Sequence, residues 1–410
     1  MFSVHTFLKD NQLRILQILA AVPVLAYFFV LYVYAQNIPY WDDYVVTLQF
    51  FNNFFGSNAF SGKTSALLAQ WSEHRIVIGR ILSLIQFYPF GILNFKILHL
   101  LANTSVILIF ILLLKDTDKS LRKWLILPIV LLLFQLQYYV ATFWFVSSSS
   151  MFFVLLFALA SFYFFKQEEY AFCALFGVLA LFSNGNGFLV LLLEILFLFC
   201  SKKFKPALVF VSLFVILMAI YFHGYIPHEN DRLSTLYFLK APLPTGLYFL
   251  SFLGGCFNLF SLAPVFGLGF LVSLAWLSIK KHYLKNPSIY LMVLFIVGSA
   301  FLAAIGRSFW GVDQALESRY KIFSIIGWIC LLIAAFEYLP ISRRRQVSPF
   351  LLGFCLMFNV GSYYKSWPFM MNFQEAQKDD YKEVIAGTPR ENLNEAHSIL
   401  MMSREKGYYK

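Results

Sequence analysis

Apolar runs long enough to cross a lipid bilayer follow one another through almost the whole chain, and this feature limits the fold more than any other. A hydrocarbon core of about 30 Å requires about 20 apolar residues in a helix. By this criterion the predicted spans are residues 15–36, 92–114, 124–143, 150–165, 170–182, 187–201, 206–222, 263–279, 288–304, 322–338 and 348–364. Two further apolar stretches, 76–90 and 246–260, are interrupted or too close to a neighbouring span, so we expect helices lying in the outer membrane interface.

The overall composition agrees with a polytopic membrane protein. The chain is 60% hydrophobic and 13% charged, with a mean hydropathy of +0.70, which excludes a soluble fold. A net charge of +11 does not indicate a nucleic-acid partner, because the basic residues form short clusters between apolar runs. We predict an all-α transmembrane bundle of about 11 spans over residues 1–364, followed by a short C-terminal tail over residues 365–410.

The distribution of lysine and arginine predicts the orientation. With a cytoplasmic start, eleven crossings place "KDTDKSLRK", "KQEE", "SKKFK", "KKHYLK" and "SRRR" on one side, and with Lys9 and Arg14 these loops hold 16 of the 32 basic residues. This is the positive-inside pattern. The tail carries 7 basic and 7 acidic residues and lies on the periplasmic side by parity. We therefore expect a multi-pass protein of the bacterial inner membrane, in contact with membrane lipids.

The same parity places the chemically rich loops together on the outer side. The first is "PYWDDY", in which Asp42 and Asp43 follow Trp41 directly after the first span. Asp42 has two interpretations. It can cap the next helix by accepting backbone amide hydrogen bonds. Alternatively, desolvation and the neighbouring acid raise its pKa and make it a general base for a hydroxyl nucleophile.

The second outer motif is "WSEHRIVIGR", which contains Glu73, His74, Arg75 and Arg80. If the segment is helical, Trp71 and Arg75 share a face, as do Glu73 and Arg80. The arginines can extend to lipid headgroups, or their guanidinium groups can bind a phosphate. His74 can hold a phosphate oxygen or a metal ion, or have no role.

Two later motifs complete the outer set. In "FSNGNG" the glycines allow a tight turn with positive φ, while Asn184 and Asn186 offer amides to sugar hydroxyls. In "GRSFWGVDQALESRYK", arginines suited to a lipid-linked phosphate alternate with acids that can instead neutralise them in loop salt bridges. Its candidate site residues are Arg307, Asp313, Glu317, Arg319 and Tyr320. Arg232 in "PHENDR" is a further candidate phosphate ligand.

In order, "PYWDDY…EHRIVIGRIL…FSNGNGFLV…GRSFWGVDQALESRY" resembles the integral-membrane glycosyltransferases of the C superfamily (the GT-C fold), over residues 39–320. Within that superfamily it is most similar to a bacterial branch that includes O-antigen-modifying glucosyltransferases. The resemblance implies transfer of a sugar from a polyprenyl-phosphate donor to a glycan or lipid acceptor, such as O-antigen or lipopolysaccharide, at the periplasmic face. The first acid of the pair is the catalytic base in that family, which corresponds to Asp42, while Asp43 would orient it or assist a metal.

The chemistry of the outer motifs defines the expected binding roles. Arg75, Arg307, Arg319 and Arg232 are expected to hold the donor phosphate. The other expected substrate-binding residues are Trp41, Glu73, His74, Asn184, Asn186, Asp313, Glu317 and Tyr320. No metal ligand set is predicted, and a divalent cation, Mg²⁺ or Mn²⁺, is the one cofactor left open. The alternatives are a transporter or flippase for lipid-linked glycans, which would place its polar site at the bilayer midplane, and an O-antigen polymerase or ligase.

Overall fold

The computed structural model of the protein describes residues 4–227, 236–260, 262–388 and 395–410. Within these residues the structure is helical and contains no strand, apart from an isolated β-bridge between Trp71 and His74. The bundle helices are α1 (Val4–Tyr34), α5 (Phe95–Asp116), α6 (Lys119–Leu133), α8 (Phe145–Lys166), α9 (Tyr170–Leu181), α10 (Phe188–Cys200), α11 (Phe204–Phe222), α13 (Pro242–Leu253), α14 (Ala263–Ile279), α16 (Pro287–Arg307), α17 (Lys321–Tyr338) and α18 (Ile341–Ala386).

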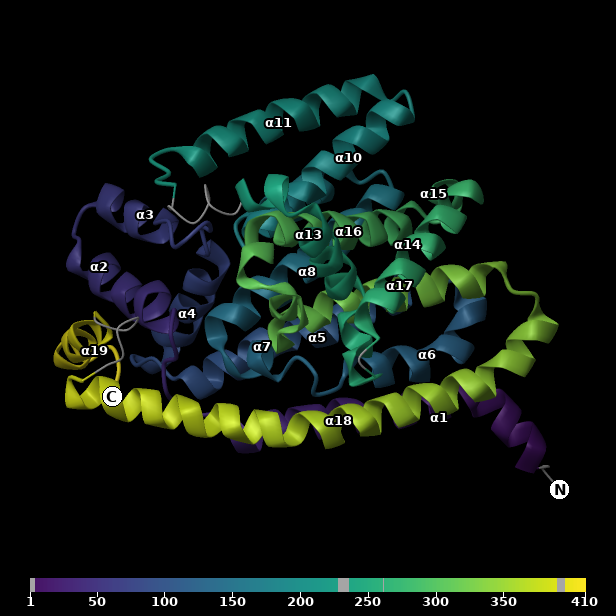
Figure 1. The fold of residues 1–410 in the computed structure, drawn as a ribbon, viewed down its shortest axis with the longest axis horizontal. Helices are drawn as coiled ribbons and strands as arrows, with labels where there is room; N and C mark the ends of the chain where they lie inside the picture. Colours follow the sequence, from purple (N-terminus) through teal and green to yellow (C-terminus); the bar gives the residue numbers. More distant parts are fainter. Residues whose placement is uncertain (1–3, 228–235, 261, 389–394) are drawn as a thin grey trace.

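Shorter helices gather mainly at one end of the bundle, where α2, α3, α4 and α19 lie together (Figure 1). We call this the loop-rich end, and the opposite end, where α15 lies, the basic end. The short α-helices are α2 (Phe50–Gly56), α3 (Phe60–Leu68), α4 (Val77–Phe90), α7 (Tyr139–Phe143), α15 (His282–Lys285) and α19 (Ala396–Glu405). The remaining elements are a π-helix, η1 (Tyr44–Gln49), and the 3₁₀-helices η2 (Gly185–Gly187), η3 (Gly255–Phe260), η4 (Ser308–Trp310), η5 (Val312–Leu316) and η6 (Ser318–Tyr320).

Each predicted span contains helix, which confirms an all-helical protein within the described residues. Seven helical segments of the described chain are long and apolar enough to cross a membrane: Ile15–Tyr34, Phe95–Asp116, Phe145–Lys166, Phe204–Phe222, Pro287–Trp310, Ser318–Tyr338 and part of Ile341–Ala386. Eleven crossings remain a prediction, because helices such as α9 and α10 have only 12 and 13 residues.

Two predicted spans differ clearly from the observed helices. The run 124–143 is broken after Leu133, and the chain is irregular before α7 begins at Tyr139. The run 348–364 is only the middle of α18, whose 46 residues give a length of about 69 Å. Of the two apolar stretches expected at the interface, 76–90 forms α4, while 246–260 forms α13 and η3 and packs against α14 and α16.

The C-terminal tail packs on the segment that follows the first span. Helix α18 continues through residue 364 without interruption, so the predicted tail begins inside a helix. Further along, the Leu93 amide donates to the Tyr408 carbonyl at 2.8 Å, and the Tyr409 hydroxyl donates to the Asn37 carbonyl at 2.6 Å. The tail and the segment that carries the acidic turn therefore lie next to each other in the bundle.

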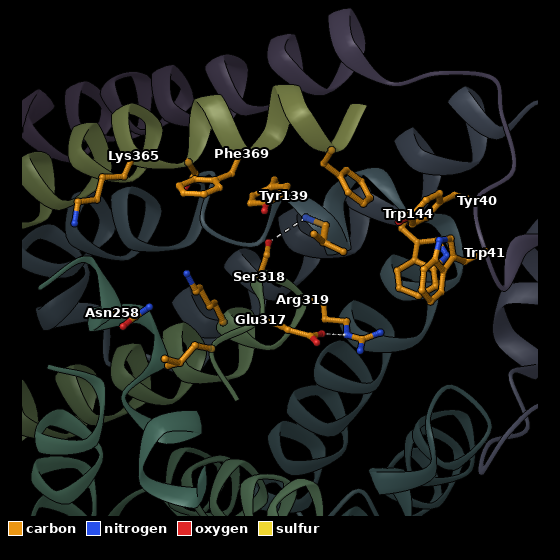
Figure 2. A pocket seen from close by; sticks show the side chains of 15 residues that line it. Tyr40, Trp41, Tyr139, Trp144, Asn258, Glu317, Ser318, Arg319, Lys365 and Phe369 are labelled. Atoms are coloured by element: carbon orange, nitrogen blue, oxygen red, sulfur yellow. Dashed lines mark hydrogen bonds and ion pairs between the residues drawn. The ribbon is translucent and has the colours of Figure 1, made fainter. Parts of the chain in front are cut away.

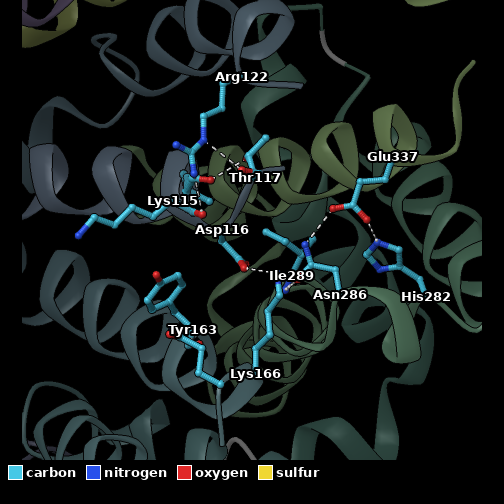
Figure 3. A network of polar contacts seen from close by, with 12 residues as sticks. Lys115, Asp116, Thr117, Arg122, Tyr163, Lys166, His282, Asn286, Ile289 and Glu337 are labelled. Atoms are coloured by element: carbon cyan, nitrogen blue, oxygen red, sulfur yellow. Dashed lines mark hydrogen bonds and ion pairs between the residues drawn. The ribbon is translucent and has the colours of Figure 1, made fainter. Parts of the chain in front are cut away.

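A largely buried polar cluster joins α5, α8, α15 and α17 to the start of α16 at the basic end (Figure 3). The Lys166 ammonium lies 2.8 Å from Asp116 Oδ1 and donates to Asn286 Oδ1 at 3.1 Å. Asn286 Nδ2 donates to Glu337 Oε1 at 2.9 Å, and His282 Nε2 lies 3.0 Å from Glu337 Oε2. These contacts link the ends of α5, α8 and α17 to the start of α16, so the cluster fixes the basic end of the bundle.

Candidate functional site

The two adjacent aspartates of the acidic turn have different environments. Asp43 is fully buried, and its two oxygens accept the backbone N–H groups of Tyr40 and Val146, each at 3.0 Å. Val146 is in the first turn of α8, so Asp43 caps that helix from a distant part of the chain. Burial raises the pKa of the Asp43 carboxyl well above its ordinary value, although both backbone hydrogen bonds oppose the shift. Asp43 therefore anchors the turn.

Asp42 is only partly buried, and its carboxylate takes part in no helix cap. The Trp71 side chain hydrogen-bonds it, and the charged groups nearest to it electrostatically are Arg319, Glu73 and Arg307. Burial raises the pKa of Asp42; the Trp71 hydrogen bond and the two arginines lower it, while Glu73 raises it further. The capping interpretation of Asp42 is wrong, because no side chain caps the helix that follows, and Asp43 accepts the amides of Tyr40 and of distant Val146 instead. Asp42 is left as a carboxylate of raised basicity.

The backbone around Asp42 adopts uncommon conformations. Trp41 has φ +47°, a left-handed conformation that bulky residues rarely adopt. Ser72, which precedes Glu73, has φ +49°. The chain then enters the π-helix η1 immediately after Asp43. Strained φ values and π-helical turns concentrate at functional sites, so the local geometry independently marks this turn.

Glu73 joins the second outer motif to the fourth. Its carboxylate pairs with Arg307 Nη2 and accepts the Ser72 hydroxyl, and it lies 3.5 Å from His74 Nε2. Burial alone would raise the pKa of Glu73, but His74, Arg307 and the Ser72 hydrogen bond together hold it well below its ordinary value. Arg307 also donates to the Tyr320 hydroxyl at 2.8 Å. An ionised Glu73 thus positions the Arg307 guanidinium beside Asp42.

Two cavities meet at this point, and both are lined by Trp41 and Arg319. The first, of about 700 Å³, is lined by Glu73, His74 and Arg307, and we call it the arginine cavity. The second, of about 670 Å³, extends to Lys321 and Lys365, and we call it the lysine cavity (Figure 2). Asp42 itself lines neither cavity, but it follows Trp41 and is influenced most strongly among cations by Arg319, and these two residues line both cavities, so its carboxylate lies close to the residues that the cavities share.

The "FSNGNG" turn forms part of the wall of the arginine cavity. Asn184, Gly185 and Asn186 all line it. Asn186 Nδ2 donates to the Ser299 hydroxyl at 2.9 Å, while its buried Oδ1 accepts no hydrogen bond from any residue that the structure describes. The helices on either side of the turn, α9 and α10, have 12 and 13 residues and reach only about 18–20 Å, which is less than a bilayer core of about 30 Å. Irregular backbone at such depth is tolerated where it lines a cavity, which this turn does.

The two glycines of this turn serve close packing rather than positive φ. Neither Gly185 nor Gly187 is among the residues with positive φ, which corrects the sequence-based expectation. A Cβ on Gly185 would lie 2.7 Å from His74 Nδ1, and a Cβ on Gly187 would lie 2.1 Å from the Ala180 carbonyl oxygen. The Gly185 N–H donates to His74 Nδ1 at 3.2 Å, so in the neutral ring Nε2 carries the proton that faces Glu73.

The segment 71–75 is a turn and not a helix, because α4 begins only at Val77. The expected helical faces of "WSEHRIVIGR" are therefore wrong. Arg75 lines neither cavity: its guanidinium donates to the carbonyls of Leu68, Tyr221 and His223. This removes Arg75 from the candidate phosphate ligands, and its burial also excludes extension to lipid headgroups.

Arg80 has a similar structural role, since it is buried and donates to the carbonyls of Leu67 and Ala69. Asp313 is exposed and lines neither cavity, so its expected substrate contact is not supported. Arg232 lies outside the described residues.

Arg319 occupies the boundary between the cavities. Its Nε lies 2.8 Å from Glu317 Oε2, and its guanidinium carbon lies 5.6 Å from the Trp144 ring and 5.1 Å from the Tyr320 ring. The salt-bridge interpretation of this loop is therefore partly correct, because Glu317 offsets one arginine. Of the predicted residues, Trp41, Glu73, His74, Asn184, Asn186, Arg307, Glu317, Arg319 and Tyr320 line one or both cavities.

The described residues do not provide a metal site. Among them, no group of three or more histidine, cysteine, aspartate or glutamate side chains is arranged to bind a metal ion. Both Asp43 oxygens already accept backbone hydrogen bonds. The acidic pair therefore does not fit a divalent cation held by Asp42 and Asp43 together.

Sequence reasoning missed several residues of the site. Trp71 hydrogen-bonds Asp42, Trp144 contacts Arg319, and Lys321 and Lys365 line the lysine cavity. Trp71 and Lys321 are the first and last residues of two predicted motifs, but no site role was assigned to either of them. Trp144 and Lys365 lie in or beside predicted spans, where nothing in the sequence distinguishes them from interfacial residues.

Comparison of the chain with protein-family models, with curated proteins and with solved structures found no match.

Proposed function

We propose that the protein is a membrane glycosyltransferase that moves a sugar from a polyprenyl-phosphate donor to a hydroxyl of a cell-surface glycan or lipid acceptor. The observation that carries the proposal is that Asp42, a partly buried carboxylate outside any helix cap, is close to Arg319 and Arg307, which between them line two adjoining cavities. A transferase must bring two substrates to one reacting centre, and each cavity is large enough to hold one of them.

The arginine cavity is the proposed donor site. Its polar groups include Arg307 and Arg319, and its walls include the apolar side chains of Met151, Phe188 and Met218 from α8, α10 and α11. Guanidinium groups bind phosphate oxygens in two-point contacts. A lipid phosphate needs both kinds of surface, charged at the headgroup and apolar along the tail.

In the proposed reaction, the oxygen of the acceptor hydroxyl attacks the anomeric carbon of the donor sugar while Asp42 removes the proton from that hydroxyl. The bond between that carbon and the phosphate oxygen breaks, and polyprenyl phosphate leaves with the electron pair. Arg319 and Arg307 stabilise the additional negative charge on the phosphate, so no general acid is required. Burial raises the pKa of Asp42, which makes it a stronger base than an exposed aspartate.

Glu73 has a positioning role in this scheme. It holds Arg307 by an ion pair and lies against His74, which in turn accepts the Gly185 N–H. We assign the site to the periplasmic side of the bacterial inner membrane on the basis of the loop charges, because the basic clusters lie at the opposite end of the bundle.

The test is incubation of the purified protein with a panel of polyprenyl-phosphate sugars and candidate acceptors, with detection of free polyprenyl phosphate. We expect release with at least one donor, and loss of release in Asp42→Asn. Lys378→Gln, an exposed change on α18 away from both cavities, is the matched control and should retain activity. Turnover of Asp42→Asn at the wild-type rate would exclude Asp42 as the base.

A second variant tests the donor site. Arg319→Ala should raise the KM for the donor more than the KM for the acceptor, because it removes a cation from the proposed phosphate position. An unchanged donor KM would contradict the phosphate role.

A further inference from the structure

The indole ring of Trp41 borders both cavities and belongs to the residue that directly precedes Asp42. Although tryptophan is one of the largest apolar residues, this side chain is 43% exposed. Figure 2 shows it at the end of the lysine cavity where Tyr40 and Trp144 also lie. The part of a substrate that reaches Asp42 is therefore expected to lie close to the Trp41 ring.

The backbone of Trp41 is strained. Its φ of +47° lies in the left-handed region, which glycine and asparagine adopt far more readily than a bulky residue. Two backbone hydrogen bonds close the turn around it. The Asp43 N–H donates to the Tyr40 carbonyl at 3.0 Å, and the Tyr44 N–H donates to the Trp41 carbonyl at 3.2 Å. These bonds fix the direction in which the indole projects, and much of its surface stays open. Packing alone therefore does not account for a tryptophan at this position, whereas contact with a ligand does.

Tyr40 extends the aromatic surface on the side of the lysine cavity. The ring centroids of Tyr40 and Trp41 are 5.9 Å apart, and the ring planes make an angle of 38°. The Tyr40 ring is held in turn by edge-to-face contacts with Trp144 and Phe373, at centroid distances of 5.6 and 5.1 Å. Tyr40 lines the lysine cavity but not the arginine cavity. The combined surface of the two rings therefore faces the cavity that the proposed donor does not occupy.

A sugar ring suits this aromatic surface. One face of a pyranose presents mainly C–H groups, whose hydrogens carry a partial positive charge, and the face of an aromatic ring is negative. Stacking also removes apolar surface from water. The hydroxyl groups project from the edge of the pyranose, so a ring stacked on Trp41 can direct one of them to Asp42.

We infer that Trp41 and Tyr40 form a stacking platform for the sugar ring of the acceptor, and that Trp41 sets the position of this ring relative to Asp42. This inference rests on the proposed function and assigns acceptor recognition in that reaction to particular residues. Trp41 contacts the sugar directly, while Tyr40 supports the indole and enlarges the surface.

The experiment compares Trp41→Ala, Trp41→Phe and Trp276→Ala in the polyprenyl-phosphate release assay. Trp276 is the matched control, because it is a 39% exposed tryptophan that packs on a tyrosine and lines neither cavity. Trp41→Ala should raise the KM for the acceptor about two- to tenfold, the factor expected for one aromatic contact, and leave the donor KM unchanged. Trp41→Phe should give an intermediate acceptor KM, and Trp276→Ala should change neither constant.

A fourth variant, Trp41→Gly, separates binding from stability. It removes the indole and also the backbone strain, since glycine adopts positive φ without a steric cost. Its Tm should therefore equal or exceed that of Trp41→Ala, while its acceptor KM should be raised at least as much. A lower Tm for Trp41→Gly would contradict the assignment of strain to this residue.

An unchanged acceptor KM in Trp41→Ala, or a change in the donor KM alone, would overturn the inference and leave the proposed function intact. If no donor and acceptor support transfer, the proposed function fails, and the platform is tested by binding alone. The probe is then a panel of methyl glycosides of hexose disaccharides, observed by saturation-transfer difference NMR. Ring C–H protons of at least one sugar should be saturated by the wild-type protein and by Trp276→Ala, and not by Trp41→Ala. Absence of saturation with the wild-type protein, or equal saturation with Trp41→Ala, refutes the platform.

Discussion

Replacing each of the two adjacent aspartates by asparagine should separate catalysis from folding. Asp42→Asn preserves the shape of the side chain and an oxygen for the Trp71 hydrogen bond but removes the base, so transfer should fall about 10²–10⁴-fold. Folding raises the pKa of this carboxyl. The stability that the group contributes to the protein is therefore lost as the pH rises from the pKa of the unfolded state through the pKa of the folded state. Above that range the amide should leave the stability of the protein unchanged or slightly higher.

Asp43→Asn should instead lower the stability of the folded protein. The carboxylate accepts the N–H groups of Tyr40 and Val146, both at 3.0 Å, whereas an amide has only one acceptor oxygen. Leaving one of these buried N–H groups without its acceptor costs about 1–3 kcal/mol, whether or not the carboxyl is ionised. With an unfolding entropy of about 2.1 cal/mol/K per residue, 1 kcal/mol corresponds to about 1.2 °C for 410 residues, so Tm should fall by about 1–4 °C.

Both variants are purified in the same detergent, and their thermal unfolding is followed by tryptophan fluorescence alongside the release of polyprenyl phosphate. The expected result is a stable, inactive Asp42→Asn protein and a less stable Asp43→Asn protein. The reasoning is refuted if Asp42→Asn is the less stable of the two, or if Asp43→Asn unfolds at the wild-type temperature.

Three further predictions follow from particular contacts. Gly185→Ala should strongly reduce transfer, because the added Cβ would lie 2.7 Å from His74 Nδ1 and displace that ring; initial rates measure this. Glu73→Gln should move the acidic limb of the pH–rate profile to lower pH, because the negative charge of Glu73 raises the pKa of Asp42; rates over a pH series test it. Lys166→Met should destabilise the protein by about 3 kcal/mol, at the lower end for buried ion pairs because the lysine side chain is 32% exposed; thermal unfolding reports it.

Each of these variants has a matched control on the same chain. Gly246→Ala adds a Cβ that meets no atom within 4 Å, and Glu375→Gln removes an exposed acid from α18. Lys203→Met breaks an exposed ion pair with Glu168, whose loss costs at most about 1 kcal/mol. If a control matches the effect of its partner variant, the corresponding contact does not explain that effect.

The helical architecture was predictable because it depends on the length and polarity of local runs. A helix in lipid satisfies its own backbone hydrogen bonds, so an apolar run of sufficient length forms a helix whatever its neighbours. The predicted helix ends were wrong where the local apolar run does not by itself set the end of the helix. The break after Leu133 and the extension of α18 far beyond residue 364 both depend on packing against other elements, which hydropathy does not describe.

The candidate site was predictable in its membership more than in its roles. Topology alone placed the acidic turn, Glu73, His74 and the 306–320 loop on one side, and the structure brings many of their side chains to two adjoining cavities. The sequence could not show that Arg75 donates to three backbone carbonyls, because nothing in the sequence distinguishes an arginine that binds phosphate from one that anchors a loop.

The sequence by itself determined that this is a helical membrane protein and which loops carry the motifs of the candidate site, since hydrophobic run lengths and loop charges are local properties. Only the tertiary structure decided which of two neighbouring aspartates is available for chemistry. That choice depends on the Val146 amide, which lies 103 residues away and binds Asp43, leaving Asp42 beside Trp71 and the arginines. Packing brings together hydrogen-bond partners that are so distant along the chain. The sequence of two adjacent aspartates therefore does not show which of them will accept such a hydrogen bond.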